Sequence, residues 1–447
     1  MSTLATPLAP TTQAASATLS ERVEAAGIRF VLATFVDMTG KPCAKLVPAS
    51  AVGMLERDGV GFAGYAAGAI GQVPSDPDLI TLPDVASFTP LHEIKPGLAM
   101  VQCDPHVDGV PWKYAPRVIL KAVLARLAAR GITAKVGAEA EYFLVRREAS
   151  GALAVADAKD TSAQPCYDAR DLTRMYDHLT EVSTVLNGLG WANYANDHED
   201  GNGQFEQNFE YAEALTTADR LVTFRYLVQT LAERRGMTAT FMPKPFTDRT
   251  GSGLHMHMSL WDGDTPLFPA PDDPRGLGLS PLAYQFVSGL LAHAPALSAV
   301  VTPTVNSFKR TTAATTASGA TWAPRKATYG GNDRTHLVRV PDGDRIEVRL
   351  ADGSANPYLA MAALLTAGLA GIDAAADPGE PGSGTADLPP TLLHAVEALG
   401  ADPVVSGALD AAGDGVAAYY ARIKREEFLA WHSQVSSWET DTYLTAF

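Results

Sequence analysis

Three short runs of this chain alternate polar or charged residues with apolar ones at a period of two. They are VGAEAEYF at 136–143, GLHMHMSLW at 253–261 and RIEVRL at 345–350. Successive side chains of a β-strand point to opposite faces, so each run places its acids, histidines or arginines on one face. We therefore predict three strands with one chemically active face each, and burial of the RIEVRL face requires a partner ion.

Longer stretches of the chain show helical periodicity instead. Strands and helices follow one another without a regular βαβ alternation, which indicates the α+β class. The clearest helical segments are RVILKAVLARLAARG at 117–131, DLTRMYDHLTEVSTVLNGLG at 171–190, TADRLVTFRYLVQTLAERRG at 217–236 and NPYLAMAALLTAGLAGI at 356–372.

The chain divides at the proline-flanked segment 111–116. Before it, residues 27–48 predict two strands joined by a turn at Thr39-Gly40, and hence a small β-rich domain. The first residues lack the basic and apolar segments of a signal peptide. We expect a disordered tail at 1–18, a small N-terminal domain at 19–112 and a large C-terminal domain at 113–447.

The composition argues against several classes of partner. A formal net charge of −15 disfavours nucleic acid, and no run of eighteen apolar residues predicts a membrane span. Three scattered cysteines suit a reduced chain rather than a disulfide framework, so we expect a cytoplasmic protein. The sequence contains no Walker A or Rossmann glycine pattern.

Acids and histidines of these runs form a candidate metal centre. Two glutamates share one predicted strand face, two histidines share another, and HEDGNGQFE adds two acids around a glycine turn. For the first glutamate pair alone, a solvent-facing alternation is the more ordinary interpretation. Together the groups predict two adjacent oxygen-rich sites that suit Mg²⁺ or Mn²⁺ rather than zinc. The candidate ligands are Glu139, Glu141, Glu199, Glu206, His255 and Glu347.

Several arginines accompany these acids. Their fixed charge and planar guanidinium suit two-point contacts with carboxylate and phosphate oxygens. Metals combined with arginines indicate phosphoryl transfer. The arginines are Arg310, Arg334, Arg339, Arg345 and Arg349.

These motifs resemble the glutamine synthetase family in content, order and approximate spacing, over most of the chain. The resemblance implies a small N-terminal β-grasp domain and a large catalytic domain with a curved antiparallel sheet flanked by helices. It also implies a dodecamer of two stacked six-membered rings, with active sites between subunits. The motifs are ExE at 139–141, GQFE at 203–206, KPF at 244–246, GSGLHMHMSL at 251–260, NSFKR at 306–310 and RIEVRLADGSANPYLAMAALL at 345–365.

The resemblance also implies roles for the matching residues. ATP would phosphorylate the γ-carboxylate of L-glutamate, and an amine would then displace phosphate from γ-glutamyl phosphate. Glu141, Glu199 and Glu206 would hold one metal, and Glu139, His255 and Glu347 the other, nearer the nucleotide phosphates. ATP would contact His257, Ser259, Arg339 and Arg345. Glutamate would bind to Gly251, Arg310 and Arg349. Arg334 would stabilise the transferring phosphoryl group.

The amine side departs from the ammonia-using members of the family. Those members carry FDGSS where this chain has FAGYA, so Ala63 stands in place of an aspartate, and Thr316 stands in place of a flap glutamate. Losing both carboxylates weakens the attraction for a small cation, and Ala63 opens volume for an alkyl group. With TWAPRKATYGGNDRTHLVRVPD and VSSWE, these features resemble the type III-like branch, which includes ligases that use methylamine. Methylamine is therefore the expected amine.

An alkylammonium ion must lose a proton before it attacks, so the site needs a base. Asp168 and Glu199 are the candidates, although Asp168 is equally suited to cap a helix that begins near Leu172. Alternative functions are an ammonia-using synthetase or a ligase for polyamine, ethanolamine or isopropylamine. A phosphotransferase that stops at an acyl phosphate and a non-enzymatic structural member are further alternatives.

Overall fold

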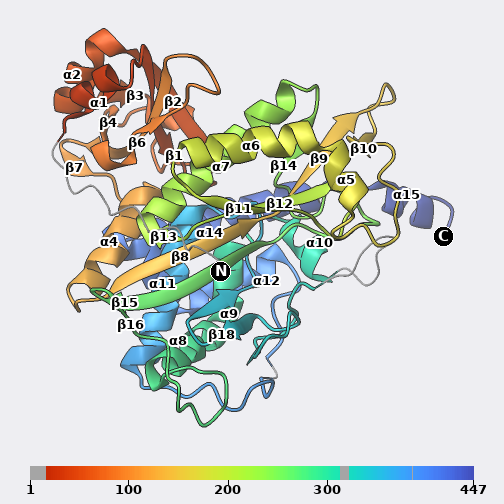
Figure 1. The fold of residues 1–447 in the computed structure, drawn as a ribbon. Coiled ribbons are helices and arrows are strands. Elements are labelled where there is room, and N and C mark those ends of the chain that lie inside the picture. The colour runs from red at the N-terminus through yellow and green to blue at the C-terminus, as the bar shows by residue number, and fades with distance from the viewer. Residues whose placement is uncertain (1–16, 313–321, 385) are drawn as a thin grey trace, which may run out of the picture.

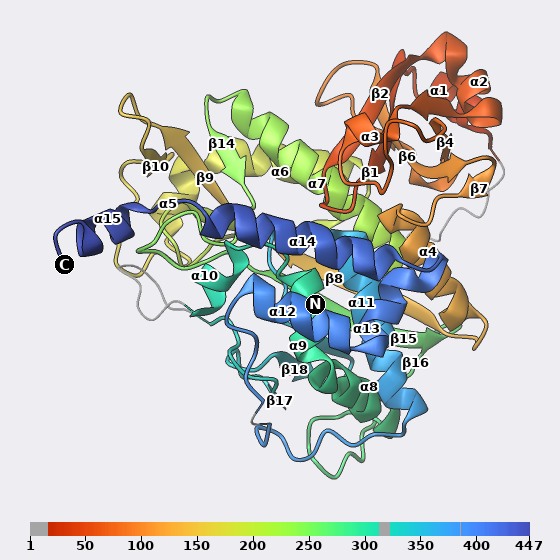
Figure 2. The same ribbon diagram turned by 180° about the vertical axis from the view of Figure 1, so that it is seen from behind.

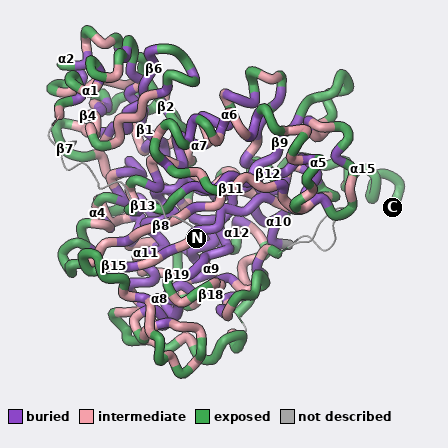
Figure 3. Tube along the Cα trace, viewed as in Figure 1, coloured by how far each residue is buried: buried purple, intermediate pink, exposed green. Residues whose placement is uncertain are grey.

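The computed structural model of the protein describes residues 17–312, 322–384 and 386–447. Figure 1 shows a small N-terminal lobe at one end of a larger body. The larger body contains two sheets covered by helices, and Figure 3 shows that its buried segments run along these sheets and the helices behind them. The α+β class predicted from the sequence is confirmed.

The N-terminal lobe is built on a mixed sheet of order β2-β1-β6-β4-β3. The two predicted strands are confirmed as an antiparallel pair, whereas β1 runs parallel to β6. Thr18, which we expected in the tail, caps α1 with Glu21 in a capping box. The elements are α1 (Leu19–Ala25), β1 (Phe30–Val36), β2 (Pro42–Pro48), α2 (Val52–Asp58), β3 (Val60–Phe62), α3 (Gly64–Ala67), β4 (Leu79–Pro83), β5 (Thr89–Pro90), β6 (Leu98–Val107) and β7 (Val110–Pro111).

The three alternating runs of the sequence lie on neighbouring strands of one sheet, of order β13-β8-β15-β19-β18-β17. His255 stands opposite Glu139 across β15 and β8, and His257 stands opposite Glu347 across β15 and β19. The predicted strands therefore combine their polar faces into one surface. Their bounds are β8 (Thr133–Ala140), β13 (Ala212–Glu213), β15 (Leu254–Asp262), β16 (Thr265–Pro266), β17 (Tyr329–Gly330), β18 (Val338–Asp342) and β19 (Arg345–Val348).

A second sheet, of order β10-β9-β12-β11, continues from the first. The run that we predicted as one strand breaks at Glu141, because the chain crosses there from β8 in the first sheet to β9 in the second. Glu141 therefore lies at the junction of the sheets, where its backbone N–H donates to Gly253 O at 3.2 Å. The strands are β9 (Tyr142–Arg147), β10 (Leu153–Val155), β11 (Asn193–His198), β12 (Gln204–Phe209) and β14 (Thr238–Thr240).

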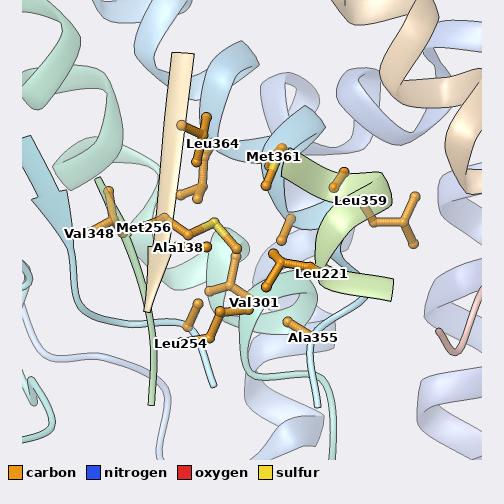
Figure 4. Close-up of a cluster of buried hydrophobic side chains, with 14 of the residues drawn as sticks. Ala138, Leu221, Leu254, Met256, Val301, Val348, Ala355, Leu359, Met361 and Leu364 are labelled. Carbon is orange, nitrogen blue, oxygen red and sulfur yellow. The ribbon is translucent and has the colours of Figure 1, made fainter. Parts of the chain in front are cut away.

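Helices cover the apolar face of the first sheet. Figure 4 shows Met256 and Val348 of the strands in one buried cluster with Met361 and Leu364 of α11. The predicted helix at 171–190 is split, because Met175 leaves helical geometry between α5 and α6. The helices are α4 (Pro116–Ala128), α5 (Ala169–Arg174), α6 (Tyr176–Gly188), α7 (Ala214–Glu233), α8 (Pro281–Ala292), α9 (Ala294–Val301), α10 (Ser307–Thr312), α11 (Pro357–Asp373), α12 (Leu392–Ala401), α13 (Pro403–Leu409), α14 (Val416–His432) and α15 (Ser437–Tyr443).

Buried polar contacts join the lobe to the body. Arg117 at the start of α4 bonds Asp84 and Asp104 of the lobe, at 2.8 Å each, and Asp219 of α7 at 2.9 Å. Asn356, which caps α11, donates from its side chain to the backbone carbonyl of Asp37 at 2.9 Å. Because these groups come from both parts of the chain, they fix the lobe against the body.

The C-terminal segment projects away from the body. Figures 1 and 2 show α15 extending beyond the other helices. Its apolar side chains are exposed in the single chain, among them Val435, Trp438 and Leu444. Several exposed apolar side chains on one short segment indicate a contact surface.

Among the described residues, no single helix is long and apolar enough to cross a membrane. Two bent helix pairs, α8 with α9 and α12 with the segment that follows it, satisfy the same test of length and composition.

Candidate active site

A cavity of about 530 Å³ opens over the polar face of the first sheet. It brings together side chains from both sheets and from the loops that join them. Among the residues predicted from the sequence, those that line the cavity are Glu139, Glu141, Glu199, Glu206, Gly251, His255, His257, Arg310, Arg334, Arg339, Arg345 and Arg349. Glu347 is fully buried beneath it, in contact with several of these groups.

His255 lies at the centre of the acidic groups. Its Nδ1 is 3.5 Å from Glu139 Oε2 and 3.7 Å from Glu347 Oε1, and its Nε2 is 3.8 Å from Glu141 Oε1. His257 Nε2 lies 3.0 Å from the other oxygen of Glu139. Antiparallel register explains this closeness, because it places the two histidines opposite glutamates of the neighbouring strands.

Two overlapping groups of side chains are spaced closely enough to hold a cation. One group is Glu139, Glu206 and His255, and the other is Glu139, His257 and Glu347, with ligand atoms within 4.8 Å of one another. These groups overlap with the two predicted ligand sets but are not identical to them. Carboxylate oxygens dominate both groups, which suits a hard divalent metal.

Glu199 and Glu206 are the acids least able to ionise in the bare cavity. Burial raises the pKa of each well above its ordinary value, and the neighbouring carboxylates raise it further. The main neighbours are Glu141 for Glu199 and Glu139 for Glu206. A divalent cation would favour the ionised forms, so the donor set fits a metal centre.

Glu139 and Glu347 behave in the opposite way. Burial alone would raise their pKa values, but nearby groups that carry or can accept positive charge lower both. For Glu139 these are His255 and His257; Glu347 has in addition Arg339 Nη1 at 2.6 Å and Arg349 Nη1 at 2.5 Å. Both carboxylates are therefore ionised and positioned before any ligand binds.

Glycines allow the backbone to approach this centre. A Cβ at Gly253 would lie 2.8 Å from His255 Nε2, and one at Gly251 would lie 2.6 Å from Pro243 O. The Gly253 N–H donates to Glu141 Oε2 at 2.8 Å, and Gln204 Nε2 donates to the same oxygen at 2.9 Å. Glu141 is thus held by groups that larger residues in this turn would displace.

A buried pair behind the cavity fixes the backbone at Glu199. His198 Nδ1 donates to Glu199 O at 2.8 Å, and Nε2 lies 2.8 Å from Asp160 Oδ2. Asp160 also accepts from Asn202 Nδ2 at 2.8 Å and from Gly203 N, so it holds the whole HEDGNG turn. Asp160 could not be singled out from the sequence, because 38 residues separate it from His198 and no motif links the two.

The arginines line the same cavity as the acids and histidines. Arg310 is buried, and its guanidinium donates to the backbone carbonyls of Leu350 at 2.9 Å and Arg349 at 3.3 Å. Arg345 Nε donates to His257 Nδ1 at 3.1 Å. Fixed cations next to fixed anions leave a polar space that suits phosphate and carboxylate groups together.

A second cavity of about 400 Å³ shares Glu139, His257 and Arg345 with the first. Ser259, which we expect to contact ATP, lines this cavity, and its Oγ accepts from Trp261 Nε1 at 2.9 Å. The aromatic and basic lining of this cavity carries no motif that the sequence would reveal. These further residues include Tyr194, Tyr211, Trp261 and Lys135, whose ammonium lies 3.6 Å from the centroid of the Trp261 ring.

Two residues predicted for the amine side lie outside the lining of the first cavity. Asp168 caps α5 by accepting from Arg170 N at 2.8 Å and Asp171 N at 3.2 Å, and it does not line the cavity. Of its two interpretations, the helix cap is the one that these hydrogen bonds describe. Ala63 is exposed on the N-terminal lobe, before α3 and away from the cavity lining of the same chain. Thr316 lies outside the described residues.

The sheet and cavity together define a catalytic domain that can gather divalent metal, phosphate and carboxylate groups. A family model described as the catalytic domain of glutamine synthetase matches residues 113–443. The chain belongs to the glutamine synthetase family, and is a ligase of that family.

Relatives with two different names resemble the chain almost equally. It is 42% identical to a glutamine synthetase from Rhizobium leguminosarum bv. phaseoli, across 93% of this chain and 97% of that protein. It is 41% identical to the glutamate–methylamine ligase of Methyloversatilis universalis, across 94% of this chain and 97% of that ligase. A solved structure of GmaS with ADP has a TM-score of 0.90 and 47% identity, and covers 96% of this chain and 99% of that one.

Proposed function

We propose that this protein is an ATP-dependent ligase that joins L-glutamate to methylamine and forms a γ-glutamyl amide. The observation that carries the proposal is the cavity in which buried glutamates and two histidines face a set of arginines. Such a cavity offsets the charge of triphosphate, glutamate and metal within one space. Similarity to the glutamate–methylamine ligase and to GmaS supports methylamine as the amine.

Two divalent metals, Mg²⁺ or Mn²⁺, fit the acidic part of the cavity. We assign Glu141, Glu199 and Glu206 to one metal and Glu139, His255 and Glu347 to the other. The raised pKa values of Glu199 and Glu206 support this assignment, because bound cations would relieve the repulsion among these carboxylates. When bound, the metals supply positive charge to the phosphate oxygens.

ATP would occupy the second cavity, with its phosphates directed to the first. Aromatic faces such as those of Tyr211 and Trp261 suit a stacked nucleobase. His257, Ser259, Arg339 and Arg345 would contact the nucleotide. The sharing of His257 and Arg345 between the two cavities supports this orientation.

Glutamate would bind between Gly251 and the buried arginines Arg310 and Arg349. Its γ-carboxylate attacks the γ-phosphorus of ATP, and ADP leaves with the electron pair of the broken bond. Arg334 would offset the charge on the transferring phosphoryl group. Methylammonium would first lose one proton to a base; the free amine then attacks the acyl carbon of γ-glutamyl phosphate, phosphate leaves, and the nitrogen gives its second proton to water.

Glu199 is the better candidate for the base that accepts the first proton, the one that methylammonium loses before it attacks. It lines the cavity, whereas the side chain of Asp168 is engaged as a helix cap. Ala63 of a neighbouring subunit, together with Thr316, would leave the amine site without the two carboxylates that attract ammonium. This combination favours an alkylamine over ammonia.

A dodecamer of two hexameric rings would bring Ala63 to the neighbouring active site. The exposed apolar side chains of the C-terminal segment support assembly of this kind, since they have no cover in the single chain. Removing residues 434–447 should reduce the mass of the assembly measured by multi-angle light scattering. An unchanged mass would exclude this segment from the contact.

An assay of glutamate-dependent ADP release tests the ligase against its alternatives. ADP release should require methylamine, and ammonia, ethylamine and putrescine should support lower rates. Release without any amine would indicate a phosphotransferase, and faster release with ammonia would indicate a glutamine synthetase. Such an enzyme works where ATP and glutamate are abundant, which agrees with a cytoplasmic location.

A further inference from the structure

A fully buried carboxylate, that of Asp352, lies in the turn between β19 and α11, next to the first cavity but outside its lining. Its backbone N–H donates to Val301 O at 3.1 Å, and its backbone also pairs with that of Gly253. Figure 4 shows Val301 and Ala355, which flank Asp352, within the buried hydrophobic cluster. A carboxylate in such surroundings has lost its hydration, so other groups must compensate its charge.

Two arginines hold the ends of this turn. The guanidinium of Arg310 donates to the carbonyls of Arg349 and Leu350, where the turn begins. Arg225 of α7 donates from Nη2 to Ala355 O at 2.9 Å, where the turn ends. The Nε of Arg225 is buried and has no hydrogen-bond acceptor among the described residues. Both guanidinium groups therefore bond backbone carbonyls, which carry no full negative charge.

The negative charge of Asp352 acts on both arginines. Burial lowers the pKa of Arg225 to about 10 and also lowers that of Arg310, and the charge of Asp352 opposes the shift in each case. Glu141 opposes it at Arg310 as well. Glu141 is a proposed metal ligand, however, so a bound cation would share its charge. Asp352 is thus a counter-charge that Arg310 retains when the metal site is filled.

Hydrogen bonds from Ser354 fix the carboxylate of Asp352. The backbone N–H of Ser354 donates to Oδ1 at 2.9 Å, and its hydroxyl donates to the same oxygen at 2.5 Å. These bonds favour the ionised form of Asp352, against the burial that raises its pKa. The Ser354 hydroxyl also lies 3.5 Å from Ser307 Oγ, at the start of the helix α10 that carries Arg310. The position of the carboxylate is therefore set by both the turn and the helix.

We propose that Asp352 is a positioning residue for glutamate, whose carboxylate holds the guanidinium of Arg310 in the orientation that receives a carboxylate of the substrate. This inference rests on the proposed function, in which Arg310 binds glutamate. An arginine has five N–H donors, and the two carbonyls use two of those of Arg310, so others remain for the substrate. Because these donors form a rigid planar fork, a rotation of the group would misalign them together.

Steady-state kinetics of the variant Asp352→Asn test the inference. Asparagine keeps the size of the side chain and an oxygen for Ser354, but it removes the charge. We expect the KM for glutamate to rise about 10- to 100-fold, the effect of weakening a hydrogen bond to a charged group. The KM values for ATP and methylamine should stay within about twofold of the wild-type values, because neither substrate depends on Arg310.

The sign of the effect separates orientation from simple charge. Loss of a negative charge beside Arg310 would by itself strengthen the attraction for an anionic substrate. A higher KM for glutamate therefore reports lost orientation, and an unchanged or lower KM would overturn the inference. If Asp352→Asn does not fold, Ser354→Ala keeps the charge but loosens the carboxylate. It should raise the KM for glutamate about fivefold, and an unchanged value would again overturn the inference.

Arg225→Met is a matched control, because it removes a charge beside the same turn and leaves Arg310 in place. It should keep the KM for glutamate within about twofold of the wild-type value. Added to Asp352→Asn, it should restore part of the lost melting temperature, since one uncompensated cation is gone, but not the KM. Recovery of both together would show that Asp352 only stabilises the fold, and would overturn the inference. A wild-type enzyme without glutamate-dependent ADP release would instead overturn the proposed function.

Discussion

The two sides of the main cavity are built on different parts of the fold. The side with Glu139, His255 and Glu347 stands on three neighbouring strands, whose register sets the spacing of the side chains. The side with Tyr167 and Trp322, which also line the cavity, stands on loops outside any strand or helix. Strands fix distances, whereas loops accept substitution without disturbing the core. The strand side therefore has its geometry set by strand pairing, whereas the loop side can change its side chains without disturbing the sheet.

The largest effect is expected when an acid on the strand side is neutralised, because that side should serve the reaction with every amine. Glu347→Gln should lower glutamate-dependent ADP release about 10³-fold with every amine, because it removes a proposed metal ligand and the partner of two arginines. Exposed Glu397 on α12 provides a control, and Glu397→Gln should retain full activity. A loss confined to methylamine would contradict the division between the two sides.

The buried pair behind Glu199 tests how firmly the acidic side is supported. Asp160→Asn removes the charged partner of His198, and we expect Mn²⁺ affinity to fall by about 10- to 100-fold. Electron paramagnetic resonance of free Mn²⁺ measures this change at a temperature where the variant remains folded. A lower melting temperature with unchanged affinity would show that the pair only stabilises the fold.

Restoring negative charge to the amine side should shift the preference of the enzyme from methylamine toward ammonia. We expect Ala63→Asp combined with Thr316→Glu to raise the kcat/KM ratio of ammonia over methylamine about tenfold, because space for one methyl group is lost and attraction for a small cation is gained. Competition between the two amines, with mass spectrometry of the products, gives the ratio directly. If the ratio does not change, the discrimination between the two amines resides elsewhere in the enzyme.

The smallest expected effect is a dependence of metal stabilisation on pH. The pKa values of Glu199 and Glu206 are raised above the ordinary value of 4.5, so above that pH the folded metal-free chain binds more protons than the unfolded chain. The free energy of unfolding therefore falls as pH rises from there through the raised values. The lowered pKa values of Glu139 and Glu347 contribute stability that is present throughout this range.

Bound metal favours the ionised acids and offsets this loss. Mg²⁺ should consequently raise the melting temperature more at pH 8 than at pH 5, as measured by calorimetry. Equal increases at both pH values would show that Glu199 and Glu206 do not hold the metal.

The sequence predicted the strand side well because period-two alternation identifies which residues share a face. That reasoning places His255 and His257 on one strand face, and the structure puts Glu139 and Glu347 opposite them. It treated Glu141 as part of the same strand, since nothing local shows that the chain changes sheets there.

The loop side could not be predicted in the same way. Tyr167 and Trp322 are separated by a long stretch of chain, and loops have no period that reveals which residues meet. Asp168 drew attention as an acid beside Tyr167, but its side chain serves the start of α5. The positive φ of Tyr167, which directs the ring, depends on its hydrogen bond to His198 and leaves no trace in the composition.

The hydrogen bond between Asn356 and Asp37 connects two parts of the chain that would serve different active sites in the proposed ring. Asp37 also accepts from Ala69 N at 3.0 Å, so it holds the end of the segment that carries Ala63. That segment would face the neighbouring subunit. In contrast, α11, which Asn356 caps, packs behind strands β15 and β19 of its own subunit. A displacement of α11 in one subunit would therefore reach the amine site of the next, and the ring would act as a coupled series of catalytic units.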